Sequence, residues 1–152
     1  MIEALKNAKL PEAVVPVCLD ASAIEAYREA ELEARRAAAD SLSGKPETPK
    51  VPEDLVSRVE ASTIRFTLRA LPRRQWTDLV KSHPPRKDSR EDRQVGFNEE
   101  TLYEALVRAC IVDPVPSDEE WAQIDEVLTE GEWIRLVQTA QALNLKGTSL
   151  PF

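Results

Sequence analysis

The chain has few of the residues on which most catalytic and metal sites depend. Its 152 residues include one histidine, two cysteines and four glycines. Two cysteines cannot build a disulfide scaffold, and with one histidine they supply too few of the roughly four ligands of a zinc site. The low glycine count also disfavours loops that cradle nucleotide phosphates. We therefore expect no metal, no cofactor and no catalytic residue, and we predict that the protein is not an enzyme.

Positive charge and long apolar runs are also scarce. Lys and Arg together number 20 against 27 Asp and Glu, so the net charge is 20 − 27 = −7. An acidic chain repels phosphate, which disfavours nucleic acid as a partner. No run of about 18 apolar residues is present, and the N-terminus lacks the basic-then-apolar pattern of a signal peptide. We expect no membrane contact and a location in the cytoplasm.

Two segments are typical of β-strands. Residues 14–19 are apolar and β-branched, which predicts a strand. Pro16 cannot donate a ladder hydrogen bond, so we expect this strand to lie at a sheet edge or to be interrupted at Pro16. Residues 63–71 alternate strictly between an apolar face and a polar face. We predict that the two strands pair with each other, in an orientation that the sequence leaves open.

The stretch between these strands is rich in helix formers. Residues 21–42 consist largely of Ala, Glu and Arg and carry only a thin apolar stripe, so this helix does not lie in a thick core. Asp20 and Ser22 both offer caps at its start, and Ser22 and Glu25 have the spacing of a capping box. The Pro- and Gly-containing segment 43–52 is interpreted as a linker, and a short helix follows at about 53–60. The two helices are predicted to form a projecting hairpin arm.

Four further helices are expected after the second strand. The first follows Pro72, and the other three begin at the capping residues Asn98, Ser117 and Thr129. The helix that begins at Asn98 is expected to stop near Asp113-Pro114. By contrast, residues 83–96 are highly charged and almost without apolar side chains, which predicts a mobile loop.

These elements predict an α+β fold that is predominantly helical. It has a C-terminal bundle of about four helices, a two-stranded β element and an N-terminal helical arm. The predicted organisation is a strand with a helical hairpin arm at 1–62, a strand plus a helical core domain at 63–146, and a flexible tail at 147–152.

Residues that carry chemistry in other proteins have ordinary interpretations here. His83 adjoins two prolines in a charged segment and is interpreted as a solvated residue without the partner that a general base needs. Cys18 and Cys110 are interpreted as small buried apolar side chains. The acidic pairs and triplets at 99–100 and 118–120 fall at helix N-termini, where carboxylates oppose the helix dipole.

Two groups of residues are candidates for partner binding. One group is aromatic: Trp76, Phe97, Trp121 and Trp133. These are expected to be structural anchors, and any of them could border a groove for an amphipathic helix, with ordinary core packing as the alternative. The other group is the one local basic patch: Arg65, Arg69, Arg73 and Arg74. The net charge favours an acidic protein segment over nucleic acid as its partner.

Several blocks carry a resemblance to a known family. They are residues 15–20, 66–76, 78–80, 83–86, 96–102, 109–114, 119–121, 128–133 and 140–144. In these blocks the chain resembles the tail assembly chaperones of long-tailed, siphovirus-type phages, in the form found in phages and prophages of actinobacteria. The resemblance spans roughly residues 13–145, and its motifs concern fold and packing, with no active site among them.

The resemblance implies a non-enzymatic assembly factor in the cytoplasm of the bacterial host. Such proteins coat the tape measure protein, keep it soluble, recruit tail tube protein and leave before the tail is complete, so the chain is not expected in the mature virion. A longer frameshifted form of the same protein is an implied partner, and a homo-oligomer stays open. The alternatives are a permanent structural subunit of a tail or other assembly, and a regulatory module that binds nucleic acid.

Overall fold

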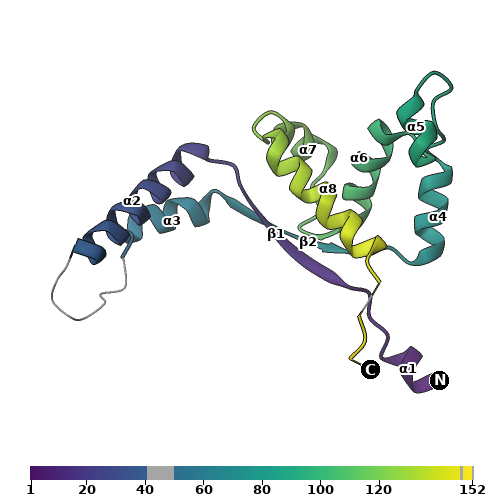
Figure 1. The fold of residues 1–152 in the computed structure, drawn as a ribbon, viewed down its shortest axis with the longest axis horizontal. Coiled ribbons are helices and arrows are strands. Elements are labelled where there is room, and N and C mark those ends of the chain that lie inside the picture. Colours follow the sequence, from purple (N-terminus) through teal and green to yellow (C-terminus); the bar gives the residue numbers. More distant parts are fainter. Residues whose placement is uncertain (41–49, 148, 152) are drawn as a thin grey trace. The chain divides into compact units, whose positions relative to one another are not determined.

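The computed structural model describes residues 1–40, 50–147 and 149–151 of the chain. It is 60% helical with a small antiparallel sheet, which confirms the predicted α+β, predominantly helical class (Figure 1). The elements in chain order are α1 (Ile2–Lys6), β1 (Glu12–Cys18), α2 (Ala21–Asp40), α3 (Glu53–Ala61), β2 (Thr63–Arg69), α4 (Arg73–Lys81), α5 (Arg90–Val95), α6 (Glu99–Cys110), β3 (Ile111–Asp113), α7 (Asp118–Asp125) and α8 (Glu130–Leu145).

The chain divides into two compact units. One unit comprises Met1–Val15 together with Arg65–Phe152, and the other comprises Pro16–Ile64. Strands β1 and β2 therefore contribute residues to both units, and helices α2 and α3 belong to the second one alone. The predicted segments 1–62, 63–146 and 147–152 stay a prediction.

The sheet has the order β1-β2-β3. The Leu19 amide donates to the Ser62 carbonyl at 2.8 Å and the Ala70 amide donates to the Pro11 carbonyl at 2.9 Å. Residue numbers therefore rise along β1 as they fall along β2, which makes the pair antiparallel. The predicted pairing of these two strands is confirmed, and its orientation is now known.

Strand β3 corrects the prediction of a two-stranded element. The sequence predicted that the preceding helix would continue to Asp113, but α6 ends at Cys110 and the β-branched pair Ile111-Val112 begins a strand. This strand runs antiparallel to β2, with Leu68 opposite Ile111 and Thr67 opposite Asp113. The register therefore shifts between Thr67 and Leu68. A three-residue strand is too short to show alternation, so its pairing with a distant partner decides its conformation.

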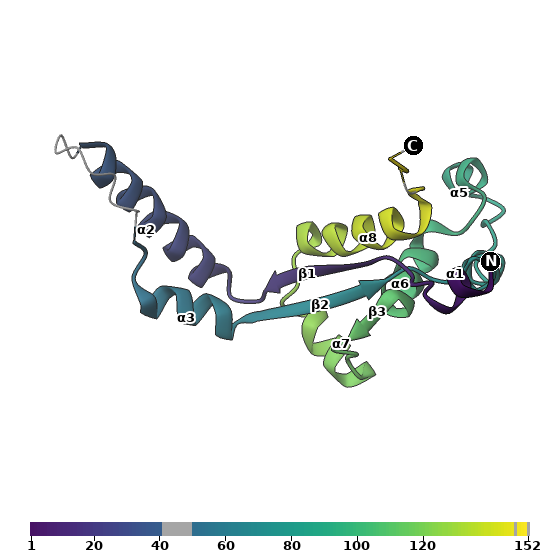
Figure 2. The same cartoon turned by 90° about the horizontal axis from the view of Figure 1, so that it is seen from below.

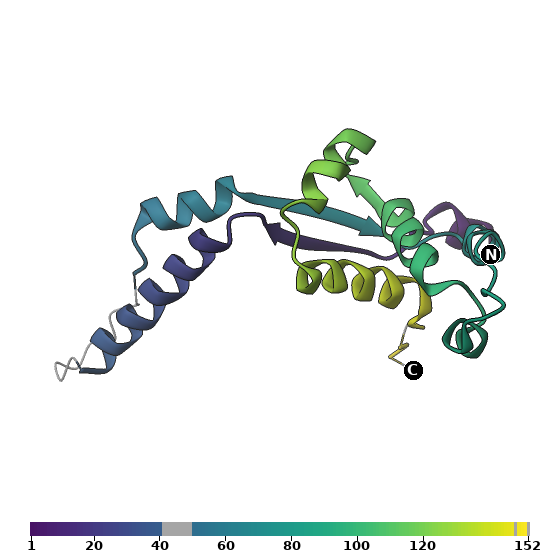
Figure 3. The same cartoon turned by 90° about the horizontal axis from the view of Figure 1, so that it is seen from above.

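The core of the larger unit forms on the apolar face of β2. Phe66 is the largest of the fully buried side chains, and Leu68 from the same face is fully buried as well. Helices α6 and α8 supply Leu102, Leu106 and Leu136, which are also fully buried. These helices pack against each other, and α8 runs beside β1 (Figures 2 and 3).

In the second unit, Asp20 joins the start of α2 to α3. One carboxylate oxygen accepts the Ala23 amide at 3.1 Å and the Ser22 hydroxyl at 2.7 Å, while the other accepts Arg58 Nη2 at 3.0 Å. The hydrogen bonds from Ser22 and then from Ala23 lower the pKa of Asp20, with a further contribution from Arg58, while burial acts in the opposite direction. Of the two caps that the sequence offers, Asp20 therefore takes the capping role, as predicted, and the Ser22 hydroxyl donates to the Asp20 carboxylate.

The tip of the hairpin arm lies outside the described residues. The structure does not describe residues 41–49, which contain the predicted end of the first helix, at 41–42, and most of the predicted linker. Before and after them, α2 and α3 pack against each other, as the prediction of a helical hairpin requires. Only Ala23 of α2 is buried, in agreement with the thin apolar stripe of this helix.

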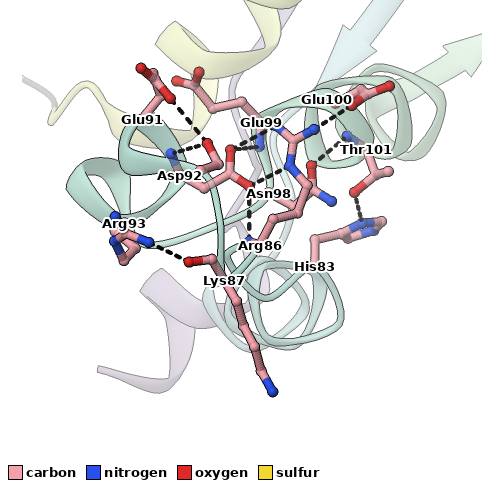
Figure 4. Close-up of polar contacts among 11 residues, drawn as sticks. His83, Arg86, Lys87, Glu91, Asp92, Arg93, Asn98, Glu99, Glu100 and Thr101 are labelled. Carbon is pink, nitrogen blue, oxygen red and sulfur yellow. Dashed lines mark hydrogen bonds and ion pairs between the residues drawn. The ribbon is translucent and has the colours of Figure 1, made fainter.

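The charged segment 83–96 is not the mobile loop that its composition predicted. It contains α5, whose N-cap is Ser89, and Asp92 within this helix has no exposed surface. Arg86 donates to the Asp92 carboxylate from its backbone amide at 3.0 Å, from Nε at 2.8 Å and from Nη2 at 3.0 Å (Figure 4). Its Nη1 also reaches Glu100 at 2.5 Å. The segment has few apolar side chains to pack into a core, and the charge-assisted hydrogen bonds between Arg86 and Asp92 hold it in place instead.

The Asp92 carboxylate makes the stability of this segment depend on pH. The hydrogen bonds from Arg86 hold the pKa of Asp92 far below its usual range, although burial acts in the opposite direction. A carboxyl whose pKa is depressed by folding contributes stability above its unfolded pKa of about 4, and this contribution is lost as the pH falls toward the folded pKa.

We expect Asp92→Asn to lower the midpoint of thermal unfolding at neutral pH, because it leaves the Arg86 guanidinium without its charge partner. The difference between wild type and variant should shrink as the pH falls from about 5 to about 2, where the wild-type carboxylate becomes protonated. Thermal melts followed by circular dichroism over this range would measure it. Asp88→Asn, at an exposed position just before α5, is the matched control, and an equal pH response of the two variants would contradict the assignment.

Candidate functional site

A cleft of about 400 Å³ lies between helices α6, α7 and α8. Its lining residues are Glu99, Glu100, Tyr103, Glu104, Arg108, Trp121, Asp125, Leu128, Thr129, Glu130 and Trp133. Two of the four aromatic residues predicted from the sequence, Trp121 and Trp133, therefore meet in one cleft. We call this surface the tryptophan cleft.

The two tryptophans of the cleft have different environments. Trp121 is only 4% exposed, and its ring stacks on Phe66 with 6.0 Å between ring centroids and 7° between ring planes. The Arg108 guanidinium lies 5.0 Å from the centroid of the same ring, which is within the range of a cation–π interaction. Trp133 is half-buried. Trp121 is thus held in the core. Of the two tryptophans of the cleft, Trp133 is the one whose side chain is accessible enough to contact a partner.

The charge of the tryptophan cleft is negative. It is lined by the carboxylates of Glu99, Glu100, Glu104, Asp125 and Glu130 and by one guanidinium, a net of 1 − 5 = −4. Arg108 pairs with Glu104 at 3.0 Å, and Glu100 pairs with Arg86 on the other side. Among the residues that the structure describes, the other three carboxylates have no ion pair. The cleft therefore favours a cationic group over an anionic one.

Tyr103 lines the cleft beside one of these carboxylates, and its pKa is affected by that charge. Its hydroxyl donates to the Glu99 carboxylate at 3.5 Å. Burial raises the pKa of the Tyr103 phenol, and the nearby Glu99 charge raises it further, with a partly opposing hydrogen bond to Gln141. Phe97 packs edge-on against the same ring, with 5.9 Å between centroids. Phe97 does not line the cleft itself and supports it through Tyr103.

Local sequence signals position the walls of the cleft. The side chain of Asn98 accepts the Thr101 amide at 3.4 Å and begins α6, so Glu99 and Glu100 fall in its first turn. Ser117 caps α7 with a complete capping box, and Thr129 caps α8 by accepting the Glu132 amide at 3.4 Å. All three predicted caps are confirmed. The carboxylates at 99–100 were interpreted only as capping charges, and the structure also places them in the cleft.

The other predicted site residues lie elsewhere. Trp76 is half-buried on α4 and is not among the residues that line the cleft. The basic patch is exposed at all four positions, and it too is absent from the lining: Arg65, Arg69, Arg73 and Arg74. Arg65 and Arg69 lie on the polar face of β2, where Arg69 pairs with Glu12 at 2.6 Å. The sequence alone therefore located half of the aromatic group and none of the basic patch in this cleft.

Sequence reasoning missed most of the acidic wall. The signal that could have found it is the spacing of Glu100, Glu104 and Arg108, which lie four residues apart and therefore on one face of α6. Asp125 and Glu130 sit on either side of a helix-to-helix turn, and no spacing rule brings such residues to α6. Their position depends on how α7 and α8 pack.

The histidine and the two cysteines, which are side chains that take part in catalysis or metal binding in other proteins, are in ordinary structural environments here. His83 Nδ1 is 2.8 Å from the Thr101 hydroxyl, and its ring is half-buried, so it is not the fully solvated residue that was expected. Cys110 is buried, which raises the pKa of its thiol, and Cys18 is half-buried. Within residues 1–40, 50–147 and 149–151 no group of three or more His, Cys, Asp or Glu side chains is arranged to hold a metal ion. In the same residues, no helix combines the length and apolar character needed to cross a membrane.

Comparisons of the chain with protein-family models, with curated proteins and with solved structures found no match.

We expect Trp121→Ala to destabilise the fold by about 3–5 kcal/mol, the usual cost of removing a buried aromatic side chain from a core. Trp133→Ala should cost clearly less, because part of this side chain already faces solvent. Urea denaturation followed by circular dichroism would give both free energies of unfolding. Equal losses for the two variants would show that Trp133 is a core residue and not a free wall of the cleft.

Proposed function

We propose that this protein is a non-enzymatic tail assembly chaperone. In this proposal it binds helical segments of a phage tape measure protein in the host cytoplasm, keeps that protein soluble, helps to recruit tail tube protein and is absent from the finished tail. A longer frameshifted form of the chain acts with it. The observation that carries the proposal is the tryptophan cleft, which combines a half-buried tryptophan with an acidic wall.

Such a cleft suits a helix better than it suits a small substrate. A tryptophan that is partly free on the surface offers a large apolar contact at a low cost in side-chain entropy, and tryptophans are enriched where binding energy concentrates. An apolar side chain of a partner helix would pack on Trp133 and Leu128. A lysine or arginine one turn away on that helix would reach Asp125 or Glu130.

The charge pattern also fits a chaperone for a long helical partner. The carboxylates without ion pairs attract basic positions of the partner and speed its capture, because opposite charges steer association. The overall charge of −7 keeps a complex with a largely apolar partner in solution by mutual repulsion.

The test is co-expression of the chain with the tape measure protein of the same phage or prophage. We expect the tape measure protein to become soluble and to co-purify with this chain. Purified tails should lack the chain when they are analysed by mass spectrometry. An insoluble tape measure protein beside a well-folded chain would contradict the proposal, and so would stoichiometric amounts of the chain in finished tails.

Charge reversal in the cleft gives a sharper test. We expect Asp125→Lys with Glu130→Lys to weaken co-purification of the tape measure protein by about tenfold or more, which corresponds to about 1.4 kcal/mol. Glu119→Lys with Glu126→Lys is the matched control, because it makes the same change of charge at exposed positions on and just after α7 that do not line the cleft. An equal loss with both double variants would show that only net charge matters and that the cleft is not the site.

A further inference from the structure

Strand β1 has one edge without a partner strand in the described sheet. It is the terminal strand in the order β1-β2-β3. The hydrogen bonds at Pro11 and Leu19 show that odd-numbered residues of β1 direct their amide and carbonyl groups toward β2. Backbone groups alternate in direction along an antiparallel strand, so Glu12 and Val14 direct theirs away from β2. Among the described residues, no hydrogen bond occupies these outward groups.

An apolar groove runs along this free edge. It has a volume of about 600 Å³ and lies between β1 and α8. The strand contributes Pro11, Ala13, Val14 and Val15, and the helix contributes Arg135, Gln138, Thr139, Ala142, Leu143 and Lys146. Val14 is 57% exposed although it is an apolar residue in a strand. We call this surface the edge groove.

The edge groove carries charge of one sign. Among the described residues that line it, Arg135 and Lys146 are the charged ones, and both are cations. Arg135 already contacts Glu132 on its own helix, whereas Lys146 has no ion pair within the described part of the chain. The groove is therefore apolar at its floor and positive along its helical side, opposite in sign to the tryptophan cleft.

We propose that the edge groove binds an extended, acidic segment of a partner protein by strand addition to β1. The unpaired amide and carbonyl groups of Glu12 and Val14 select an extended backbone, because a helix has no free groups to pair with them. The apolar floor selects apolar side chains on the face that meets α8. The two cations select carboxylates on the same face.

The spacing of the cations gives the pattern of the segment. Arg135 and Lys146 are eleven residues apart on and just after α8, or about 16 Å at 1.5 Å per residue. Residues on one face of a strand repeat about every 6.6 Å, so a carboxylate, an apolar residue and a second carboxylate at alternate positions span about 13 Å. Long lysine and arginine side chains cover the remaining distance.

Pro16 limits the length of the added strand. It sits at the next outward-facing position after Val14 and has no amide hydrogen to donate. Pairing is therefore confined to the first half of β1, at residues 12–15. Glu12 does not repel an acidic segment strongly, because Arg69 pairs with its carboxylate at 2.6 Å.

The electrostatics favour a different protein over a second copy of this chain. Symmetric pairing of two β1 edges would bring two edge grooves together, with two positive rims in one interface, and like charges in contact cost free energy. An acidic segment neutralises one rim instead. The proposal goes beyond the chaperone function, because it uses another surface and a partner segment of opposite charge.

Peptide binding tests the proposal directly. The probe is an acetylated and amidated peptide with the core Glu-Thr-Val-Thr-Glu, and the matched control replaces both glutamates with lysine. We expect the acidic peptide to bind at least tenfold more tightly by fluorescence anisotropy and to shift the amide NMR signals of Glu12 and Val14. Equal affinities, no binding of the acidic peptide, or concentration-dependent dimerisation through β1 would overturn the proposal.

Variants of β1 and α8, each with a control, identify the contacts. Val14→Pro removes an outward amide without touching the pairing to β2, and it should reduce binding at least tenfold, whereas Val14→Ala keeps the amide and should retain most of it. Arg135→Glu with Lys146→Glu should reverse the preference between the two peptides, which keeps the test decisive if Val14→Pro fails to fold. Unchanged binding in the charge-reversed variant would overturn the proposal. The cleft variant Asp125→Lys with Glu130→Lys should bind the acidic peptide normally, so a failure of the chaperone function is distinguished from a failure of this inference.

Discussion

The stacking of Phe66 on Trp121 joins the sheet to the C-terminal helices. Phe66 lies on the buried face of β2, and Trp121 comes from α7, more than fifty residues later in the chain. Because this contact uses one face of Trp121 and Arg108 lies over the same ring, α7 has a defined position beside α6. The tryptophan cleft exists because Trp121 is held in this way while Trp133, on α8, keeps part of its surface.

Charge organises the surface around that core in two opposite ways. Among the described residues, the lining of the tryptophan cleft has an excess of four negative charges, and the lining of the edge groove has two cations and no carboxylate. We propose that the two surfaces select two kinds of partner segment. Selection by complementary charge affects the rate and specificity of association more than its ultimate strength. This property suits the assembly factor that we propose, which has to bind and later release its partner.

The segment 83–96 shows how charge can also hold a fold together from inside. Its composition is that of a disordered segment, because it has almost no apolar residues to bury. The structure instead buries Asp92 completely and satisfies its carboxylate with three bonds from Arg86. Ser89 with Asp92 three residues later, and Gly96 at φ 89°, are helix start and stop signals that composition obscured.

Several local features of this protein can be predicted from the sequence alone, although α5 was not. Strict alternation identified β2, proline indicated an edge position for β1, and side-chain caps located the starts of α6, α7 and α8, because each depends on residues a few positions apart. By contrast, the strand β3, the buried pair of Arg86 and Asp92, and the joining of acidic and aromatic residues in one cleft became known from the tertiary structure. These depend on desolvation and on contacts between segments far apart in the chain, and neither periodicity nor composition records which distant side chain will be the partner.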